Sequence, residues 1–190
     1  IDQTVGKEHT QALVEGEIRL PDAKPDINKV LTVDGDVTIS NTKVNQDKVI
    51  VDGMVSFKVL YSADDENQPI HSMDASTDFR EEIDIPGTTE DMISDIKSNI
   101  EHIDFRLVDE TKISVKTVLN LEGKVRASNN IDIIKEVTGD EGLQVLKEKI
   151  RYEDIIGNNT ASTIIKEAFE LDESMPDILD ILRVDVKTYE

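Results

Sequence analysis

The residues of this chain that could do chemistry are three histidines and many carboxylates. His9, His71 and His102 are far apart in the sequence, although His71 and His102 fall on expected strands and could approach each other in space. A metal site needs several ligands of suitable type and geometry that converge on one point. We interpret all three as ordinary surface or edge histidines, and we predict neither a metal nor a cofactor.

The carboxylates are too numerous to indicate a reaction by themselves. The segment Asp64-Asp65-Glu66 could hold calcium weakly, but it lacks the alternating ligands, the glycine and the final Glu of an EF-hand loop. With 41 acidic residues, pairs of the kind that hydrolyse glycosides are unavoidable, and the chain has no Trp to line a sugar cleft. No nucleophile elbow, phosphate loop or zinc-protease helix is present, and there is no Cys. We therefore predict that the chain is not an enzyme.

The charge of the chain limits its partners. Its formal net charge is −20 at pH 7. Such a surface repels phosphate backbones and anionic lipid heads, so we expect no nucleic acid partner. No run approaches the roughly 20 apolar residues that cross a bilayer, so we expect no membrane insertion. A basic protein surface or a cation stays open as a partner.

The elements that must position these groups are predicted to be strands. Aromatic residues make up only 4 %, so Ile, Val and Leu must form the core, which favours pleated structure. Apolar residues alternate strictly from Val49 to Tyr61 and from Ile113 to Val125. Weaker strand candidates are residues 12–20, 31–40, 70–85 and 94–108. Polar turns separate these runs, so we predict a mainly β fold, an antiparallel β-sandwich or open barrel.

Four glycines interrupt the predicted strands in a recurring pattern of aliphatic residue, acid, Gly, any residue and branched aliphatic residue. They are Gly16, Gly35, Gly53 and Gly123. Glycine inside a strand marks a bulge, a bend or a close approach of another segment. We interpret them as structural and expect strongly curved strands. Two other segments, 92–100 and 142–156, fit either a helix or a strand, and for the second we favour a strand.

A longer repeat divides the chain. Residues 20–34 recur without gaps at residues 171–185, an offset of 151 residues that places Pro176 where Pro25 stands. We therefore predict a first β domain over residues 8–157 and the start of a second, truncated repeat unit over residues 158–190. So short a segment cannot bury a core alone. It must pack on the first unit, pair with a second molecule by self-association or domain swapping, or belong to a longer protein.

The centre of the repeat is its most distinctive motif. Its residues are Pro25, Asp26, Ile27, Val30 and Leu31 in the first copy, and Pro176, Asp177, Ile178, Ile181 and Leu182 in the second. Pro suits the first helical position, Asp suits a helix N-terminus, and the apolar residues share one helical face. We predict a short helical turn in each repeat that caps the open end of the barrel, with Ile27, Val30 and Leu31 buried in the first copy. The alternative is that this segment contacts a neighbouring module.

The segment from Leu20 to Gly35 resembles the signature of the SPOCS domain, found in SipL- and SpoVID-like spore-coat assembly proteins. Residues 49–61, 68–72 and 100–106 resemble the same family, and the similarity covers about residues 10–157. The resemblance implies a place in the mother-cell cytoplasm, at the forespore surface, with spore-coat proteins as partners. SipL-like proteins bind SpoIVA, a coat-building ATPase, although a LysM module absent from this chain could make that contact.

Two functions follow from these observations. The first is a non-catalytic protein-interaction or scaffold module in spore coat assembly. The second is a ligand-binding β domain for a cell-wall glycan or calcium, which the acidic composition would suit. The direct partner, the oligomeric state and the interface stay open, as does the question of whether residues 158–190 pack on their own chain or on another.

Overall fold

The structure, a computed structural model, describes residues 2–130, 132, 134, 138, 163–172, 174–178, 180–184 and 186. All regular secondary structure in this part of the chain is strand, so the prediction of a mainly β fold is confirmed. The six strands are β1 (Asp2–Arg19), β2 (Lys29–Asn45), β3 (Lys48–Ser62), β4 (Ile70–Asp84), β5 (Ile93–Asp109) and β6 (Lys112–Ser128). None of the described residues forms a helix that could span a membrane.

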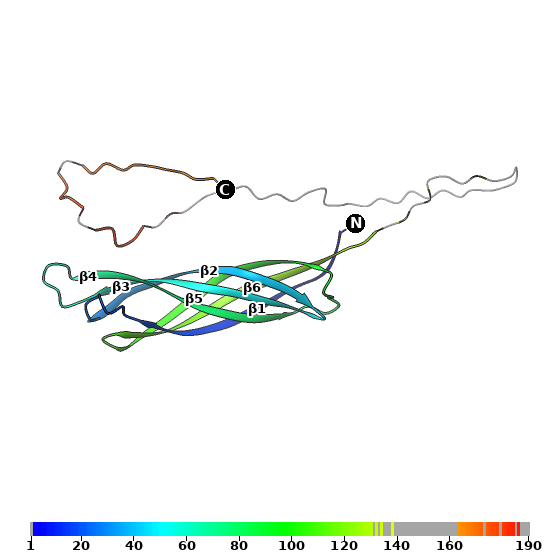
Figure 1. The fold of residues 1–190 in the computed structure, drawn as a ribbon, viewed down its shortest axis with the longest axis horizontal. Helices are drawn as coiled ribbons and strands as arrows, with labels where there is room; N and C mark the ends of the chain where they lie inside the picture. Colours follow the sequence, from blue (N-terminus) through cyan, green and yellow to red (C-terminus); the bar gives the residue numbers. More distant parts are fainter. Residues whose placement is uncertain are drawn as a thin grey trace.

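The strands form two antiparallel sheets of three (Figure 1). One sheet has the order β2-β3-β4 and follows the chain as a simple meander. The other has the order β1-β6-β5, so the first strand in the sequence pairs with the last, with Asp2 opposite Ser128. β3 and β6 are therefore the central strands, and they correspond to the two runs with the strictest alternation in the sequence.

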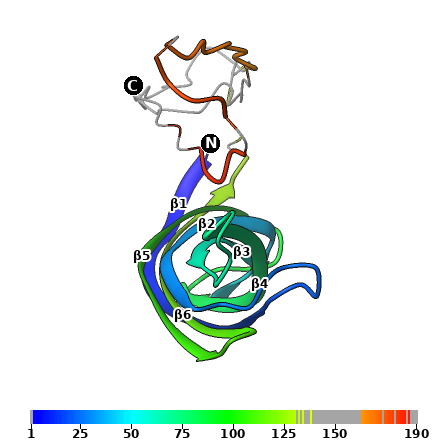
Figure 2. The same ribbon diagram turned by 90° about the vertical axis from the view of Figure 1, so that its left-hand side faces the viewer.

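The two sheets face each other and curl so far that their edges meet, β2 beside β5 and β1 beside β4 (Figure 2). The hydroxyl of Ser94 on β5 donates to the hydroxyl of Thr42 on β2 at 3.2 Å across the first of these seams. Backbone pairing in residues 2–128 stays within the two sheets. The body is therefore a curved sandwich of the kind that the glycine-rich strands predicted.

The core is the space between the central strands. Val49, Val51, Val55, Val59 and Tyr61 point inward from β3 and are fully buried. Ile113, Val115, Leu119, Leu121 and Val125 do the same from β6. Most residues of both sets are β-branched. Such side chains favour the extended backbone of a strand, and here they also fill the interior.

The four strand glycines lie where another element comes very close. A Cβ on Gly53 would lie 2.5 Å from Cζ of Phe79 and 2.7 Å from the carbonyl oxygen of Thr38. A Cβ on Gly16 would lie 2.4 Å from Oγ1 of Thr77, across the seam between β1 and β4. Gly35 faces Ile103 and Gly123 faces Ile83 in the same way. The register shifts lie elsewhere, next to Val5, Leu31, Ser40, Glu101 and Val108.

The structure corrects the predicted helical turn. Residues 21–28 form a loop without helix, in which the N–H of Lys24 donates to the carbonyl of Pro21 at 2.9 Å. The N–H of Ile27 donates to the carbonyl of Glu110 at 2.7 Å, and the N–H of Asn28 donates to the carbonyl of Ser62 at 2.8 Å. These distant acceptors replace the carbonyls that a helix would have used.

Several boundaries also differ from those predicted. β1 begins at Asp2, ahead of the predicted domain start at residue 8, because its first residues pair with the end of β6. The ambiguous segment 92–100 is strand, since β5 begins at Ile93. The strand predicted over residues 142–156 and the domain boundary at residue 157 lie outside the described residues.

Candidate interaction surface

Three connections gather at one end of the body, and we call them the three-loop end: residues 20–28, 63–69 and 110–111 (Figure 1). They meet there because alternate connections of antiparallel strands return to the same end. The loop of residues 20–28 binds both others. The N–H of Leu20 donates to the carbonyl of Thr111 at 2.8 Å, and the side-chain amide of Asn28 donates to a carboxylate oxygen of Asp64 at 3.0 Å. The three-loop end is thus one continuous surface, and the Pro-Asp-Ile motif lies in it.

Two side chains attach the motif to the core. Ile27 is 2 % exposed and closes the apolar interior at this end. The hydroxyl of Tyr61 donates to the carbonyl of Pro25 at 3.2 Å, and the ring of Tyr61 stacks on His71 with centroids 5.7 Å apart. Burial raises the pKa of Tyr61 because the phenolate would be poorly solvated there. Pro25 and Ile27 are therefore fixed to the core, while Asp26 between these two residues stays exposed.

The three-loop end is strongly acidic. Its carboxylates are Asp22, Asp26, Asp64, Asp65, Glu66 and Glu110, and Asp109 adjoins them as the last residue of β5. Within these loops the opposing cation is Lys24, whose ammonium donates to the carbonyl of Ser72 at 2.7 Å. Arg19, Lys29 and Lys112 lie at the adjoining strand ends. The backbone N–H and hydroxyl of Thr111 lower the pKa of Asp109, which keeps that carboxylate ionised. A surface of this kind attracts cationic side chains rather than phosphates or carboxylates.

A shallow hollow gives this acidic surface its shape. It is lined by Pro25, Asp26, Ile27, Asn28, Asp64, Leu107, Val108, Asp109 and Glu110. Val108 is a bulge residue with 46 % of its side chain exposed, so the hollow offers an apolar wall beside its carboxylates. Apolar contact together with negative charge suits the stem and head of a lysine or arginine.

The histidines do not converge. His71 lies on β4, buried beneath the three-loop end, and its Nε2 is 3.9 Å from a carboxylate oxygen of Asp65. His102 is exposed on β5 and lies 3.0 Å from Asp104, and His9 on β1 lies 3.5 Å from Glu122. Among the described residues, no group of three His, Asp or Glu could hold a metal ion.

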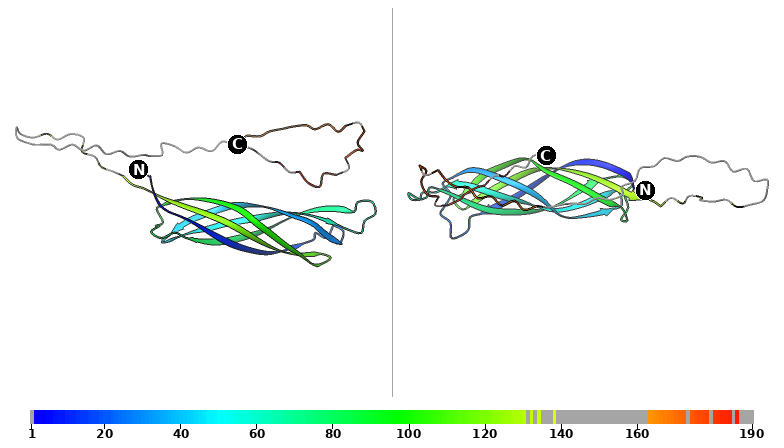
Figure 3. Two further views of the ribbon diagram at one scale, coloured as in Figure 1. Left: turned by 180° about the vertical axis from the view of Figure 1, so that it is seen from behind. Right: turned by 90° about the horizontal axis from the view of Figure 1, so that it is seen from above.

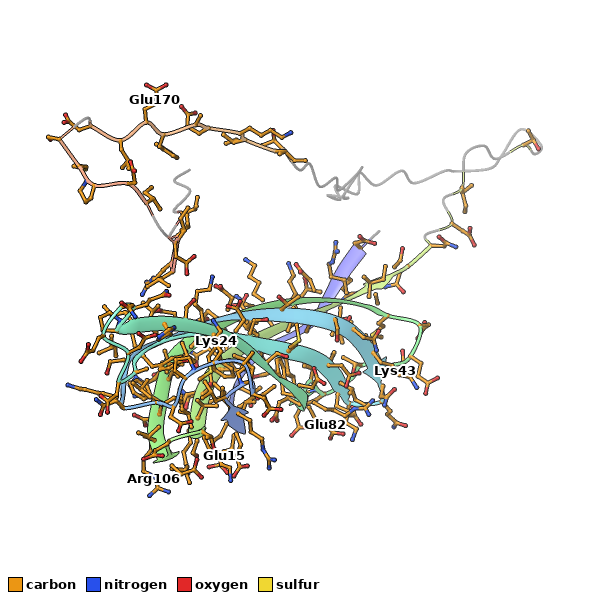
Figure 4. All side chains as sticks on the ribbon, turned by 60° about the vertical axis from the view of Figure 1, so that its left-hand side comes forward. Glu15, Lys24, Lys43, Glu82, Arg106 and Glu170 are labelled. Atoms are coloured by element: carbon orange, nitrogen blue, oxygen red, sulfur yellow. The ribbon has the colours of Figure 1, made fainter. Side chains whose placement is uncertain are left out.

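The second copy of the motif has no core to close. Pro176, Asp177, Ile178 and Ile181 are exposed and Leu182 is half-buried, and none of them lies in a strand. Ile178 is 58 % exposed where its counterpart Ile27 is 2 % exposed. One local feature does recur: the N–H of Met175 donates to the carbonyl of Asp172 at 2.9 Å, as that of Lys24 does to Pro21. Glu170 points away from the body (Figure 4).

Two motif residues, Val30 and Leu31, lie on β2 rather than in the loop. Val30 is half-buried and packs against the core from β2. Leu31 is the extra residue of a bulge and is 46 % exposed, so the expectation that it is buried with Ile27 is wrong. The helical spacing placed it inward, whereas the bulge turns it out of the core.

Sequence reasoning missed the acidic group beside the motif. Asp109 and Glu110 lie 82 and 83 residues beyond Ile27 in the sequence, and only the fold brings them to the motif. The signal that could have found them is the parity of the turns. In an antiparallel body, the first, third and fifth connections share an end, and all three carry carboxylates here.

The fold and its surfaces define a small β-sandwich module. Its Pro-Asp-Ile motif connects the three-loop end to the core. A family model described as SipL, SPOCS domain matches residues 26–108, so this part of the chain is similar to that domain. The resemblance stated from the sequence is confirmed over that range, which runs from Asp26 of the motif into β5. No curated protein and no solved structure matches the chain.

Proposed function

We propose that this chain is a non-catalytic protein-interaction module in spore coat assembly, working at the forespore surface in the mother cell. The observation that carries the proposal is the match of residues 26–108 to the SPOCS domain of SipL. The matched region includes Asp26 and Ile27 of the motif and the connection of residues 63–69, and it ends within β5, before residues 110–111.

The three-loop end is the surface on which we place the partner. The backbone of its loop 20–28 is fixed by hydrogen bonds to residues 110–111 and to Ser62 at the end of β3, so little conformational freedom is lost when a partner binds. Its carboxylates select a partner with an exposed lysine- or arginine-rich segment. SpoIVA, which SipL-like proteins bind, is the first candidate, and another coat protein or a second copy of this chain would meet the same requirement.

The test is capture from sporulating cells with the chain as bait. The decisive variant neutralises Asp22, Asp26 and Glu110, whose carboxylates make no hydrogen bond or ion pair within the described residues. A matched variant neutralises Asp84, Glu90 and Asp95 at the opposite end, so the change in net charge is identical. We expect the first variant to capture about tenfold less coat protein, as three exposed ion pairs would predict, and the second to behave like the wild type.

Two outcomes would count against the proposal. If the unchanged chain captures no coat or forespore-surface protein, the proposed role fails. If both variants lose capture equally, the partner responds to overall charge and the three-loop end is the wrong surface. The rival function, binding of calcium or a wall glycan, predicts a rise in melting temperature with that ligand. A panel that gives no rise removes it.

A further inference from the structure

The described part of residues 163–186, which we call the tail, touches the outer face of the β2-β3-β4 sheet. A guanidinium nitrogen of Arg183 lies 2.6 Å from a carboxylate oxygen of Asp34 on β2. Arg183 and Val184 together line a hollow on the outer face of the β2-β3-β4 sheet, beside Asp36, Met54 and Ser56. Figure 3 shows the tail alongside the strands from two further directions.

The hollow has the charge that a cation requires. Asp34, Asp36 and Asp74 line it, against one ammonium, that of Lys58, which lies 3.8 Å from Asp74. The guanidinium of an arginine therefore neutralises part of the excess negative charge on this face. A second contact continues the same segment, since the side-chain amide of Gln68 donates to a carboxylate oxygen of Asp180 at 3.5 Å.

The repeat explains why this contact belongs to the second copy. Arg183 occupies the position that Thr32 occupies in the first copy. The hydroxyl of Thr32 lies 3.5 Å from the same oxygen of Asp34 that Arg183 binds. The first copy therefore folds without a cation at this position. In the second copy, Arg183 binds a residue of the other repeat unit rather than one of its own.

We propose that consecutive repeat units of this chain dock on one another, with Arg183 and Val184 of the second unit seated in the Asp34 hollow of the first. Repeats joined in this way hold a set orientation instead of moving independently. An exposed ion pair is weak between separate molecules. It suffices here because both partners lie on one chain, which raises their effective concentration. The inference does not rest on the proposed role in the coat.

The chain has no Cys, so a pair of engineered cysteines reports the contact directly. Ser56→Cys and Val184→Cys place two thiols in the same hollow, to be joined by a short bismaleimide. We expect rapid cross-linking within single molecules, at a rate independent of protein concentration and lower at high salt. Adding Arg183→Glu should slow the reaction about fivefold, and adding Asp34→Lys to that variant should restore it.

A matched pair supplies the control. Ser114→Cys lies on the outer face of the other sheet, so we expect little cross-linking between it and Val184→Cys. Equal rates for the two pairs would show that the tail has no preferred seat, and the proposal would be overturned. Cross-links between molecules would also overturn it, because Arg183 would then serve a second copy of the chain. Failure of coat-protein capture would leave this result unaffected.

Discussion

At the scale of single residues, Tyr61 connects the buried core to the motif. Its ring lies in the interior beside His71, and its hydroxyl ends at the carbonyl of Pro25. A hydroxyl in this position satisfies a carbonyl at the boundary of the core that would otherwise lose a partner. Tyr61 therefore couples the stability of the body to the conformation of the loop that forms the interaction surface.

Replacement of Tyr61 by Phe should reveal this coupling through its pH dependence. Removal of the hydrogen bond should cost about 1 kcal/mol of unfolding free energy at pH 7. Burial raises the pKa of Tyr61, so the folded state holds this proton more tightly than the unfolded state. The stabilisation by Tyr61 is fully present below the unfolded pKa, near 10, and declines as the pH rises toward the folded pKa.

Urea unfolding at a series of pH values from 7 to 11 gives the comparison. We expect the difference between wild type and Tyr61→Phe to shrink above about pH 10, because only the wild type loses the contribution of this group. A difference that stays constant to pH 11 would mean that the phenol ionises as easily in the folded protein as in the unfolded chain.

At the scale of elements, the loop of residues 20–28 closes one end of the sandwich by inserting Ile27. Truncation to Ala should cost about 2–5 kcal/mol, the range for large buried aliphatic residues. The matched change Ile178→Ala in the second copy removes the same atoms from an exposed side chain, so it should cost less than about 0.5 kcal/mol. Chemical denaturation of both variants measures the contrast. Equal losses would mean that Ile178 is also buried in solution.

The packing of β4 on β3 depends on Gly53. A methyl group there would meet the ring of Phe79 and the carbonyl oxygen of Thr38, and that backbone atom cannot turn away. Gly53→Ala should therefore cost about 1–3 kcal/mol. Gly123→Ala is the control, because its nearest neighbour at 3.1 Å is the end of the Ile83 side chain. Thermal unfolding should rank Gly53→Ala as the less stable variant, and the reverse order would contradict the close approach.

The elements also show what a sequence can predict. The strands of the body were predictable, because the period of two in β3 and β6 records which side chains face the core. The helical turn was predicted wrongly, although Ile27, Val30 and Leu31 have helical spacing. The N–H groups of Ile27 and Asn28 bond to Glu110 and Ser62, which are remote in the sequence. A local pattern contains no information about such distant acceptors.

At the scale of the whole molecule, the same limit applies more strongly. The sequence predicted antiparallel strands joined by polar turns, and β2, β3 and β4 follow one another in this way, but the pairing of β1 with β6 joins the two ends of the body. That pairing fixes which connections lie together, and so it creates the acidic three-loop end. The motif residues were found from the repeat, whereas Asp109 and Glu110 became part of the site only once the sheets were in place.

The closed pairing of β1 with β6 also makes residues 2–128 a complete unit. We expect a fragment of residues 1–130 to unfold in one cooperative step, with an unfolding free energy within about 1 kcal/mol of that of the full chain. The physical reason is that the described tail contributes mostly exposed side chains and an exposed ion pair, whereas the buried apolar residues of the described part of the chain lie in β1–β6 and in the connections between these strands. Urea unfolding followed by circular dichroism at equal protein concentrations measures both transitions. A fragment that stays unfolded, or that loses several kcal/mol, would place part of the core beyond residue 130.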